Sequence, residues 1–341
     1  MQATQIAPQR SRLFPARLVR LRPGTATARM ILKRLAYLAF VLVAVTFLVS
    51  AMIELMPGEP AYAILGESAT PEQIAALHEQ LNLDQPLVQR YVSWLGNAVQ
   101  GDLGESVRGG VNVWDQIEQR LSVTIELVVG AQILALLFAV GTGVYAAYRP
   151  RRLFDNVTGT MASALIAVPN FVLALFLVIA FSVNLKWFPV AGFTPLSENI
   201  GENLKSVTLP LLAVAAAPAG IYQRLLRADL SATLREDYIA MAEAKGQSTT
   251  RILLRHALRP SLFSLMTLVG VTLAQTIGGS VTVEIIFGLP GIGRLLIDSI
   301  NLRDVTTIQG IVAFIGVGYV VINTLVDILY GVVDPRVRRA R

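Results

Sequence analysis

The stretch SVTIELVVGAQILALLFAVGTGVYAAY, residues Ser122–Tyr148, decides the class of this protein. It is almost entirely apolar, with the one acidic residue Glu126 near its start. Its length exceeds the roughly 20 residues that a helix needs to cross the hydrocarbon core of a bilayer. The stretch therefore predicts a membrane-spanning helix.

The composition of the whole chain agrees with that prediction. Of its 341 residues, 54% are hydrophobic and only 15% are charged, whereas soluble domains carry about 25% charged residues. Cysteine is absent, which excludes disulfides, thiolate chemistry and cysteine-based metal sites. With only His78 and His256, the sequence also argues against a histidine-based metal site.

Six segments are long and apolar enough to span a membrane, so the expected fold is an all-α integral membrane protein with six transmembrane helices. Prolines at 210 and 218 leave the ends of the fourth segment open, although proline is tolerated in membrane helices. The segments are Leu35–Met56, Ser122–Tyr148, Val157–Val183, Val207–Tyr222, Ser261–Phe287 and Thr306–Tyr330.

The positions of the basic residues predict the orientation. In a six-span chain that alternates sides, 22 of the 29 Lys and Arg residues fall on one side. That side is the cytoplasm by the positive-inside rule, so both termini are expected to be cytoplasmic. Because most basic residues lie on that one side, the net charge of +6 does not indicate a nucleic-acid partner.

These spans divide the chain into regions. A basic cytoplasmic arm precedes the first span, a lid or docking region follows it outside the cytoplasm, and a five-helix core with one large cytoplasmic loop leads to a short basic tail. In the same order, the expected bounds are 1–34, 35–56, 57–120, 121–335 with the loop at 224–260, and 336–341.

The region 57–120 is acidic, with nine Asp or Glu residues against three Arg. Thr70 followed by Pro71 predicts the N-cap and first residue of a short helix. The sequence QGDLGESVRGG, residues 100–110, predicts a glycine-rich turn. The region is too small for an enzyme domain.

The polar stretch DYIAMAEAKGQSTTRILLRHALRP, residues Asp237–Pro260, interrupts this apolar chain. It predicts a first helix over Tyr238–Lys245, ended by Gly246 in the left-handed conformation, and a second helix capped by Ser248. A basic stripe then follows on one helical face: Arg251, Arg255 and Arg259. Such a segment suits a groove on a cytoplasmic partner, but contact with anionic lipid or with solvent alone is also consistent with it.

The same stretch resembles the cytoplasmic EAA loop of ABC-importer permeases, in the form found in the dipeptide/oligopeptide group. In the general consensus, Glu-Ala-Ala stands where this chain has Ala240, Met241 and Ala242, so only the last residue matches, and Pro260 lies one position late. The residues assigned by resemblance to coupling are Asp237, Tyr238, Ala242, Glu243, Ala244, Lys245 and Gly246.

Further blocks carry the resemblance over about residues 31–338. The extracytoplasmic stretch from Leu55 to Ser106 is similar to the first such segment of that family almost throughout, and VEIIFGLPGIGRLL and DILYGVVDPR are similar to its late signatures. The resemblance implies the architecture of a type I ABC importer permease in the bacterial inner membrane. It also implies that the Tyr238–Gly246 helix docks into a cleft on an ATPase subunit.

The partners implied by the resemblance are a second homologous permease, two ABC ATPase subunits, an extracytoplasmic solute-binding protein and membrane lipid, with no nucleic acid. The sequence contains no G-x-x-x-x-G-K-[ST] phosphate loop. ATP and Mg²⁺ are therefore expected on the ATPase subunits, and no cofactor is expected in this chain. Di- or oligopeptides are the implied cargo, but nickel, haem or another small solute stays open.

Other classes of membrane protein fit less well. A secondary transporter would place ionisable residues near the middle of the bilayer, whereas the four acids in or near spans are expected at water-accessible span ends. No channel filter and no G-x-S-x-G nucleophile motif occurs. The four acids are Glu54, Glu126, Glu284 and Asp327.

The substrate path is the least defined feature. Proline and small residues interrupt two of the predicted spans, where they allow either a kink and close helix packing or the lining of a path. Glu284 matches a signature position of the resembling family without indicating which role it has. The candidates for either role are Pro169, Asn170, Gly278, Gly279 and Glu284.

Overall fold

The computed structural model describes residues 25–52, 60–66, 68–81, 84–107 and 109–333. Within these ranges the chain is helical apart from its connections, and the only strand-like feature there is a single antiparallel bridge between Glu105 and Asn112. The predicted tail at 336–341, the greater part of the predicted arm and Glu54 lie outside the described residues. The all-α prediction is confirmed for the described chain.

The helices fall into three groups along the sequence. The first group is α1 (Thr25–Ala51), α2 (Pro60–Leu65), α3 (Pro71–Leu81) and α4 (Leu87–Val99). The second is α5 (Val113–Tyr148), α6 (Leu153–Ala167), α7 (Asn170–Leu177) with a π-helical continuation (Val178–Asn184), and α8 (Ile200–Thr233). The third is α9 (Asp237–Ala244), α10 (Thr249–Arg251) with a π-helical segment (Ile252–Ala257), α11 (Leu258–Ile286), α12 (Ile292–Asn301) and α13 (Val305–Val333).

Four uninterrupted helical runs are long and apolar enough to cross a membrane. Each overlaps a predicted span, and α1 adds a shorter apolar helix over Ala36–Ala51. The expected third span is not one straight helix, because α6 and the helix that begins at Asn170 meet at an angle of 105°. The count of six spans thus stays a prediction. The four runs are Val113–Tyr148, Ile200–Thr233, Thr249–Ile286 and Val305–Thr324.

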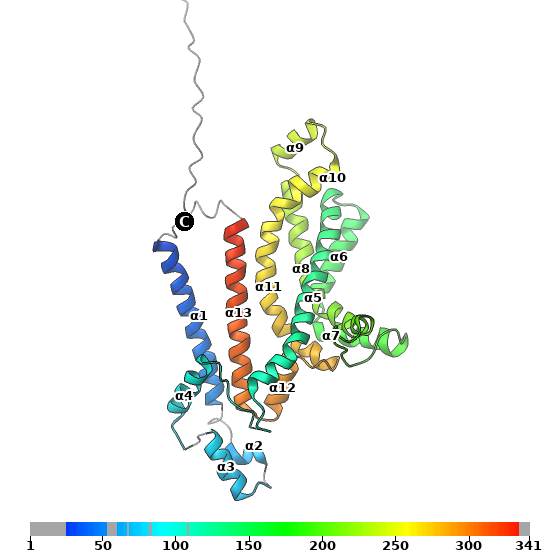
Figure 1. Cartoon of the computed structure of the whole chain (residues 1–341). Helices are drawn as coiled ribbons and strands as arrows, with labels where there is room; N and C mark the ends of the chain where they lie inside the picture. The colour runs from blue at the N-terminus through cyan, green and yellow to red at the C-terminus, as the bar shows by residue number, and fades with distance from the viewer. Residues whose placement is uncertain (1–24, 53–59, 67, 82–83, 108, 334–341) are drawn as a thin grey trace, which may run out of the picture.

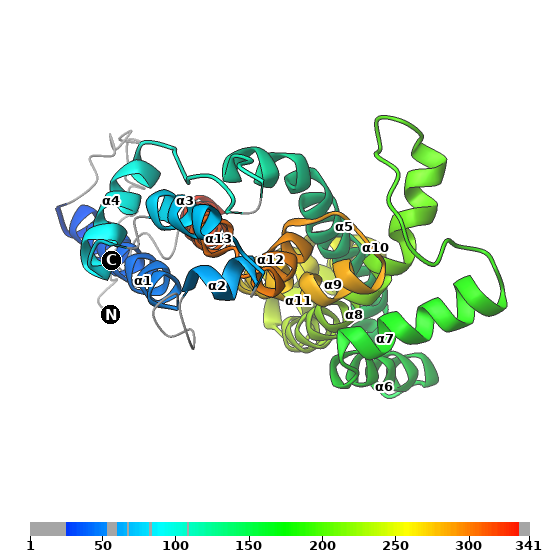
Figure 2. The ribbon, with the colours of Figure 1, turned by 90° about the horizontal axis from the view of Figure 1, so that it is seen from below.

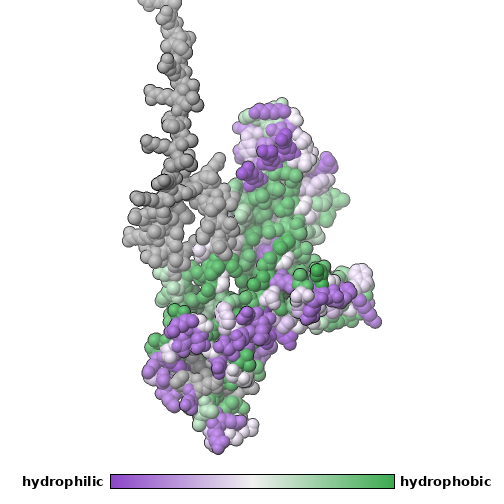
Figure 3. Space-filling model, viewed as in Figure 1, coloured by the Kyte–Doolittle hydropathy of each residue, from purple (hydrophilic) through white to green (hydrophobic). Residues whose placement is uncertain are grey.

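The long helices run roughly side by side (Figure 1). Helices α9 and α10 lie at one end, where α1 begins and α13 ends, and α2, α3 and α4 lie at the other. Seen along the helices, α1 and α13 form one group with α2, α3 and α4, and α5, α6, α8 and α11 form another (Figure 2). Mainly apolar surface separates the two polar ends (Figure 3), as expected of a chain that crosses a membrane.

Helix α8 is the centre of the larger group and packs against α5, α6, α7 and α11. Its predicted span, Val207–Tyr222, was too short, because the helix continues through Pro210 and Pro218 and ends only at Thr233. Both prolines are buried, where neighbouring helices compensate for the missing hydrogen bonds. Many of the inward residues of α8 are alanine or glycine, and small residues allow membrane helices to approach closely.

A buried polar network joins three of these helices. The hydroxyl of Tyr222 on α8 donates to Gln132 Oε1 on α5 at 2.5 Å, and the amide of Gln132 donates to Thr276 Oγ1 on α11 at 2.8 Å. The Tyr222 hydroxyl also contacts the hydroxyl of Thr272 on α11. Because lipid offers no hydrogen bonds, a network with paired members fixes the register of the three helices.

Replacing Tyr222 by Phe should destabilise the protein. The change removes the hydroxyl but keeps the ring, so Gln132 Oε1 loses its donor at a cost of about 1–3 kcal/mol. Thermal unfolding of the detergent-solubilised chain would measure the loss. Tyr148→Phe, on an exposed ring at the end of α5, is the control, and equal melting temperatures for both variants would contradict a stabilising role of the network.

Candidate functional site

Helix α9 projects from the end of the bundle where α8 ends (Figure 1). It buries Ile239 and Ala242 almost completely, whereas Tyr238 is 42% exposed and Met241 is 55% exposed. A helix this short is not stable alone, so these buried residues hold it against the rest of the protein. The structure therefore presents one face of α9 to the solvent.

Most of the residues assigned to coupling belong to this open face. Asp237, Tyr238 and the run Glu243–Gly246 are exposed, but Ala242 is buried and packs inward. The single residue that matches the Glu-Ala-Ala consensus is thus a packing residue. The basic stripe Arg251, Arg255 and Arg259 is exposed as predicted.

Gly246 ends α9 in the way that the sequence predicts. Its φ is +72°, the Gln247 N–H donates to the Ala242 carbonyl at 3.2 Å, and the Gly246 N–H donates to the Glu243 carbonyl at 2.9 Å. These two bonds form a Schellman motif, which favours glycine at the left-handed position. Ser248 occupies the expected N-cap position, but its side chain makes no capping hydrogen bond.

Two contacts connect α9 to the π-helical segment that leads into α11. The ring of His256 lies 2.8 Å from Gln247 Oε1, just beyond α9, and the Tyr238 hydroxyl donates to the His256 carbonyl at 3.4 Å. Partial burial and the nearby Glu236 carboxylate raise the pKa of Tyr238 above its ordinary value, so this hydroxyl stays protonated at neutral pH. These two contacts attach α9 to the segment that leads into α11.

Glu284 lies deep in the protein, and the expectation of a water-accessible span end was wrong. Its side chain is fully buried. It accepts hydrogen bonds from the Thr124 hydroxyl at 3.0 Å, the Arg294 N–H at 2.9 Å and the Ser280 hydroxyl at 3.4 Å. Its position near the end of a predicted span suggested that water could reach it. The predicted spans did not show that α12 packs over that end.

The glycines of the GLPGIG stretch make this burial possible. A Cβ at Gly291 would stand 2.4 Å from Glu284 Cδ, and one at Gly293 would stand 2.9 Å from Glu284 Oε2. Only glycine allows the start of α12 to close over the carboxylate, where free N–H groups and the helix dipole favour negative charge. Glu284 therefore connects α5, α11 and α12, which is a packing role.

The other path candidates come together at the bend between α6 and α7. Helix α6 ends just before Pro169, and Nδ2 of Asn170 lies 3.2 Å from the position that a Cβ on Gly279 would take. Gly278, the neighbouring residue, has open space around it. Proline and glycine residues thus lie where the bend packs against α11. The sequence identified these residues but did not predict that they would be neighbours.

Sequence reasoning missed an exposed polar face on α11. Residues three or four positions apart share a helix face, and one such line is exposed over the whole helix. Gln275 lies near the middle of the predicted span, and Ser264, Thr267 and Thr282 supply hydroxyls. We call this line the α11 stripe: Ser264, Thr267, Val271, Gln275, Gly278, Thr282 and Ile285.

The exposed surface of α6 divides into two sides. The apolar side suits lipid and consists of Leu153, Val157 and Met161. The other, which we call the polar side of α6, consists of Asn156, Thr160, Ser163 and Ala167. Polar residues at helical spacing within a membrane segment indicate a face turned away from lipid. A helical-wheel reading of residues 153–167 would have found this division.

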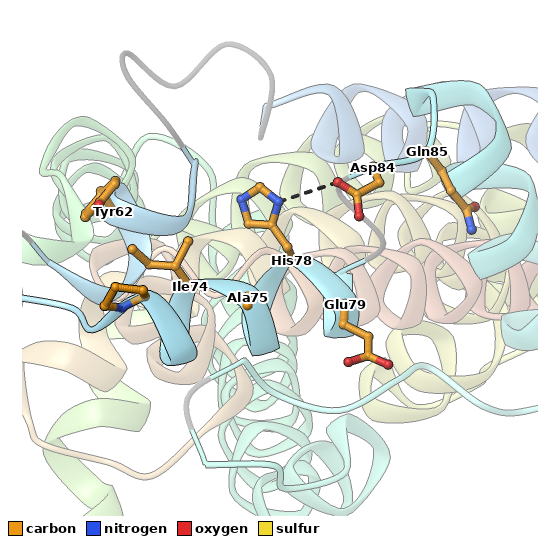
Figure 4. Close-up of a pocket in the computed structure, with 8 residues that line it drawn as sticks. Tyr62, Ile74, Ala75, His78, Glu79, Asp84 and Gln85 are labelled. Atoms are coloured by element: carbon orange, nitrogen blue, oxygen red, sulfur yellow. Dashed lines mark ion pairs between the residues drawn. The ribbon is translucent and has the colours of Figure 1, made fainter.

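The region that contains α2 and α3 carries an open hollow of about 700 Å³. Figure 4 shows the ring of His78 and the carboxylate of Asp84 facing each other there, with Nδ1 and Oδ1 3.7 Å apart. Thr70 caps α3 as predicted, because its Oγ1 accepts from the Gln73 N–H and its N–H donates to Gln73 Oε1. Among the described residues, no three His, Asp or Glu side chains gather as metal ligands would.

The glycine-rich turn after α4 is attached to the start of α13. Buried Asp304 accepts from the Ser106 hydroxyl, from the Val107 N–H at 3.3 Å and from both the N–H and the hydroxyl of Thr307. One carboxylate thus caps α13 and fixes the turn.

Comparison with known proteins identifies the family to which these features belong. The model described as "Binding-protein-dependent transport system inner membrane component" matches residues 139–339. A second model, described as "Binding-prot-dependent transport system membrane comp, N-term", matches residues 27–128. Together the two models cover most of the described chain, including α9, Glu284 and helices α2, α3 and α4.

Individual relatives match over nearly their full length. A Brucella abortus (strain 2308) protein, provisionally named as a peptide transport system permease, is 41% identical over 311 residues, which is 91% of this chain and 98% of the relative. The glutathione transport system permease protein GsiC of Shigella flexneri is 36% identical over 308 residues, covering 90% and 98%. A chain of the MetNI methionine ABC transporter, solved in inward-facing conformations, is similar in fold, with a TM-score of 0.51 and 13% sequence identity. The similarity covers 64% of this chain and 96% of that chain.

Placing a methyl group against Glu284 should destabilise the protein. Gly291→Ala would create the 2.4 Å contact described above, and overpacking of this kind costs about 1–3 kcal/mol. Gly278→Ala is the matched control, because a Cβ there meets nothing within 4 Å and alanine favours a helix by about 1 kcal/mol. Thermal unfolding in detergent separates the two, and equal stability of both variants would show that the closure over Glu284 is loose.

Proposed function

The chain belongs to the binding-protein-dependent transport system inner membrane components, and from this premise we propose that it is the permease subunit of an ABC importer that carries peptides across the inner membrane. The match to permease relatives over about nine-tenths of the chain supports this proposal. The names of those relatives, one for a peptide system and one for glutathione, favour small peptides as the cargo. The proposal assigns no covalent chemistry to this chain.

Helix α9 is the proposed contact with a separate ATPase. Its exposed face offers Tyr238 and Met241, and aromatic and methionine side chains are enriched in the centres of protein interfaces. The exposed arginine stripe beyond Gly246 adds positive charge beside that face. ATP and Mg²⁺ would be bound by two such ATPase subunits, and their closure would press on α9.

The transport path is proposed to run along the α11 stripe and the polar side of α6. An unpaired amide such as Gln275 costs about 2–7 kcal/mol when it is moved from water to an apolar medium. Neither the described part of the chain nor lipid offers it a partner, so water or cargo beside the stripe is the favourable environment. Pro169, Asn170, Gly278 and Gly279 then lie at the bend before α7, where Asn170 meets α11.

A second homologous permease would complete this path. In the proposed cycle, an extracytoplasmic binding protein releases cargo into the space between the two permeases when that space is open outward. ATP binding and hydrolysis then move α9 and reverse the opening. The extracytoplasmic region, fixed to α13 through Asp304, is the proposed platform for the binding protein.

A negative charge on the exposed face of α9 should uncouple transport. In Ala244→Asp the new carboxylate points into solvent, so the chain should fold and insert normally. Uptake of a labelled dipeptide by the reconstituted complex should fall to near background, and the ATPase should no longer co-purify in mild detergent. Ser248→Asp adds the same charge at an exposed site of the same loop and should behave as wild type.

Retained uptake and ATPase binding in Ala244→Asp would overturn α9 as the contact. Loss of both in the Ser248 control would point to a general effect of negative charge on the loop. A wild-type chain that purifies without any ATPase, and that drives uptake without ATP, would favour a secondary transporter.

The path proposal can be tested with single cysteines, because the natural chain has none. Gln275→Cys in the assembled complex should react with a small hydrophilic thiol reagent, since water is expected beside the stripe. Leu137→Cys is the control: Leu137 is 67% exposed near the middle of the α5 span, where lipid is expected. The reverse labelling pattern would move the path to α5, and an unreactive Gln275→Cys would indicate tight packing against the second permease.

A further inference from the structure

A groove of about 620 Å³ lies between α6 and α8, towards the end of the bundle that carries α9. Ligand pockets for small molecules have volumes of about 300–1,000 Å³, so the groove can hold a small solute. Its α6 wall includes part of the polar side of α6. The lining residues are Asp155, Asn156, Gly159, Thr160, Ser163, Gln223, Arg224, Arg227 and Ala228.

Two contacts between α6 and α8 form the two ends of the groove. At one, Gly220 on α8 packs so closely on α6 that a Cβ there would stand 2.4 Å from the Ala162 carbonyl oxygen. At the other, Arg227 on α8 forms an ion pair with Asp155 on α6, with Nη2 donating to Oδ2 at 2.7 Å. Between them Gly159 has no side chain, so the helices leave a space that their own residues do not fill.

The charges within the groove do not balance locally. Asp155 is buried and has its partners, because it accepts from both Arg227 and the Arg151 N–H. Arg224 is exposed to the groove and has no hydrogen-bond or ion-pair partner among the described residues. With the first pair neutral overall, the guanidinium of Arg224 leaves the groove with one uncompensated positive charge.

Beside Arg224 is a buried side chain without a partner. Gln223 is fully buried, and neither its amide nitrogen nor its amide oxygen makes a hydrogen bond in the described structure. Buried amides are nearly always hydrogen-bonded, so this pair of unsatisfied atoms at the groove indicates an absent polar partner. Thr160 and Ser163 add hydroxyls on the facing wall.

We propose that this groove is an oxyanion-binding site, in which Arg224 contacts a carboxylate or phosphate with help from Gln223 and the hydroxyls of α6. A guanidinium presents several N–H donors in a plane that matches such a group, and amide and hydroxyl donors complete its shell. The neutralised Asp155 and Arg227 pair holds the two helices at the spacing that the group requires.

Two sources can supply the oxyanion. One is the carboxylate of a peptide that leaves the path on the cytoplasmic side, and this reading rests on the proposed function. The other is the phosphate of an anionic lipid in the inner leaflet, since basic pockets between membrane helices bind such headgroups. The continuity of the groove with the polar side of α6 favours the peptide, because the apolar side of the same helix already provides a face for lipid.

Binding to the assembled complex in nanodiscs of zwitterionic lipid tests the peptide source. Labelled trialanine should bind wild type more tightly than trialanine amide, which lacks the terminal carboxylate. Arg224→Gln should weaken trialanine binding roughly tenfold, as expected for one charge-assisted hydrogen bond, and should leave the amide unaffected. Arg152→Gln, on an exposed arginine at the same end of the bundle, is the matched control and should retain the preference.

Native mass spectrometry with added phosphatidylglycerol tests the lipid source. If phosphate is the ligand, wild type and Arg152→Gln should retain one more lipid than Arg224→Gln, and both peptides should bind alike. If Arg224→Gln matches wild type in both experiments, the oxyanion site is wrong. If wild type binds and transports no peptide, the cargo assignment fails, and the lipid experiment alone decides whether the groove takes an oxyanion.

Discussion

A polar group inside a bilayer must have a protein partner or water, and this constraint sorts the polar residues of the chain into two sets. The first set is paired within the chain: Tyr222 with Gln132, and Glu284 with Thr124 and the start of α12. These pairs determine which helix faces meet and in what register. The second set, represented by Gln275, lies on open faces and has no partner among the described residues. In a membrane, a face of that kind is stable only beside water, cargo or another chain.

The paired set explains how a movement at one end can reach the rest of the molecule. Helix α9 lies between α8 and the segment that becomes α11, and buried Ile239 and Ala242 hold it there. The Tyr222 network binds α8 and α11 to α5. Because close-packed helices transmit displacement with little local deformation, we propose that a force on α9 would displace the group of α5, α8 and α11 as one body.

The sequence predicted the features that depend on one continuous stretch of the chain. It did not predict those that depend on contacts between stretches far apart in the sequence. The spans followed from apolar length, and the end of α9 followed from Gly246, because both are properties of a continuous stretch. In the sequence, the 105° bend was visible only as Pro169, since a proline signals a break but not its angle. Glu284 was misplaced because the glycines that bury it belong to α12, which folds back over the end of α11. The α11 stripe was missed because its exposure depends on which helices pack beside it.

The open polar faces also bear on how many chains build the path. The space among α5, α8 and α11 is closed by the Tyr222 network and by small apolar residues, so a solute cannot pass between these helices. The α11 stripe and the polar side of α6 instead face outward from the described chain. Lipid hydrocarbon against the α11 stripe would leave Gln275 unpaired, and solvent cannot fill the bilayer around a single chain. A second protein surface that encloses water with these faces would satisfy both requirements, which supports the proposal that the path runs between two permeases.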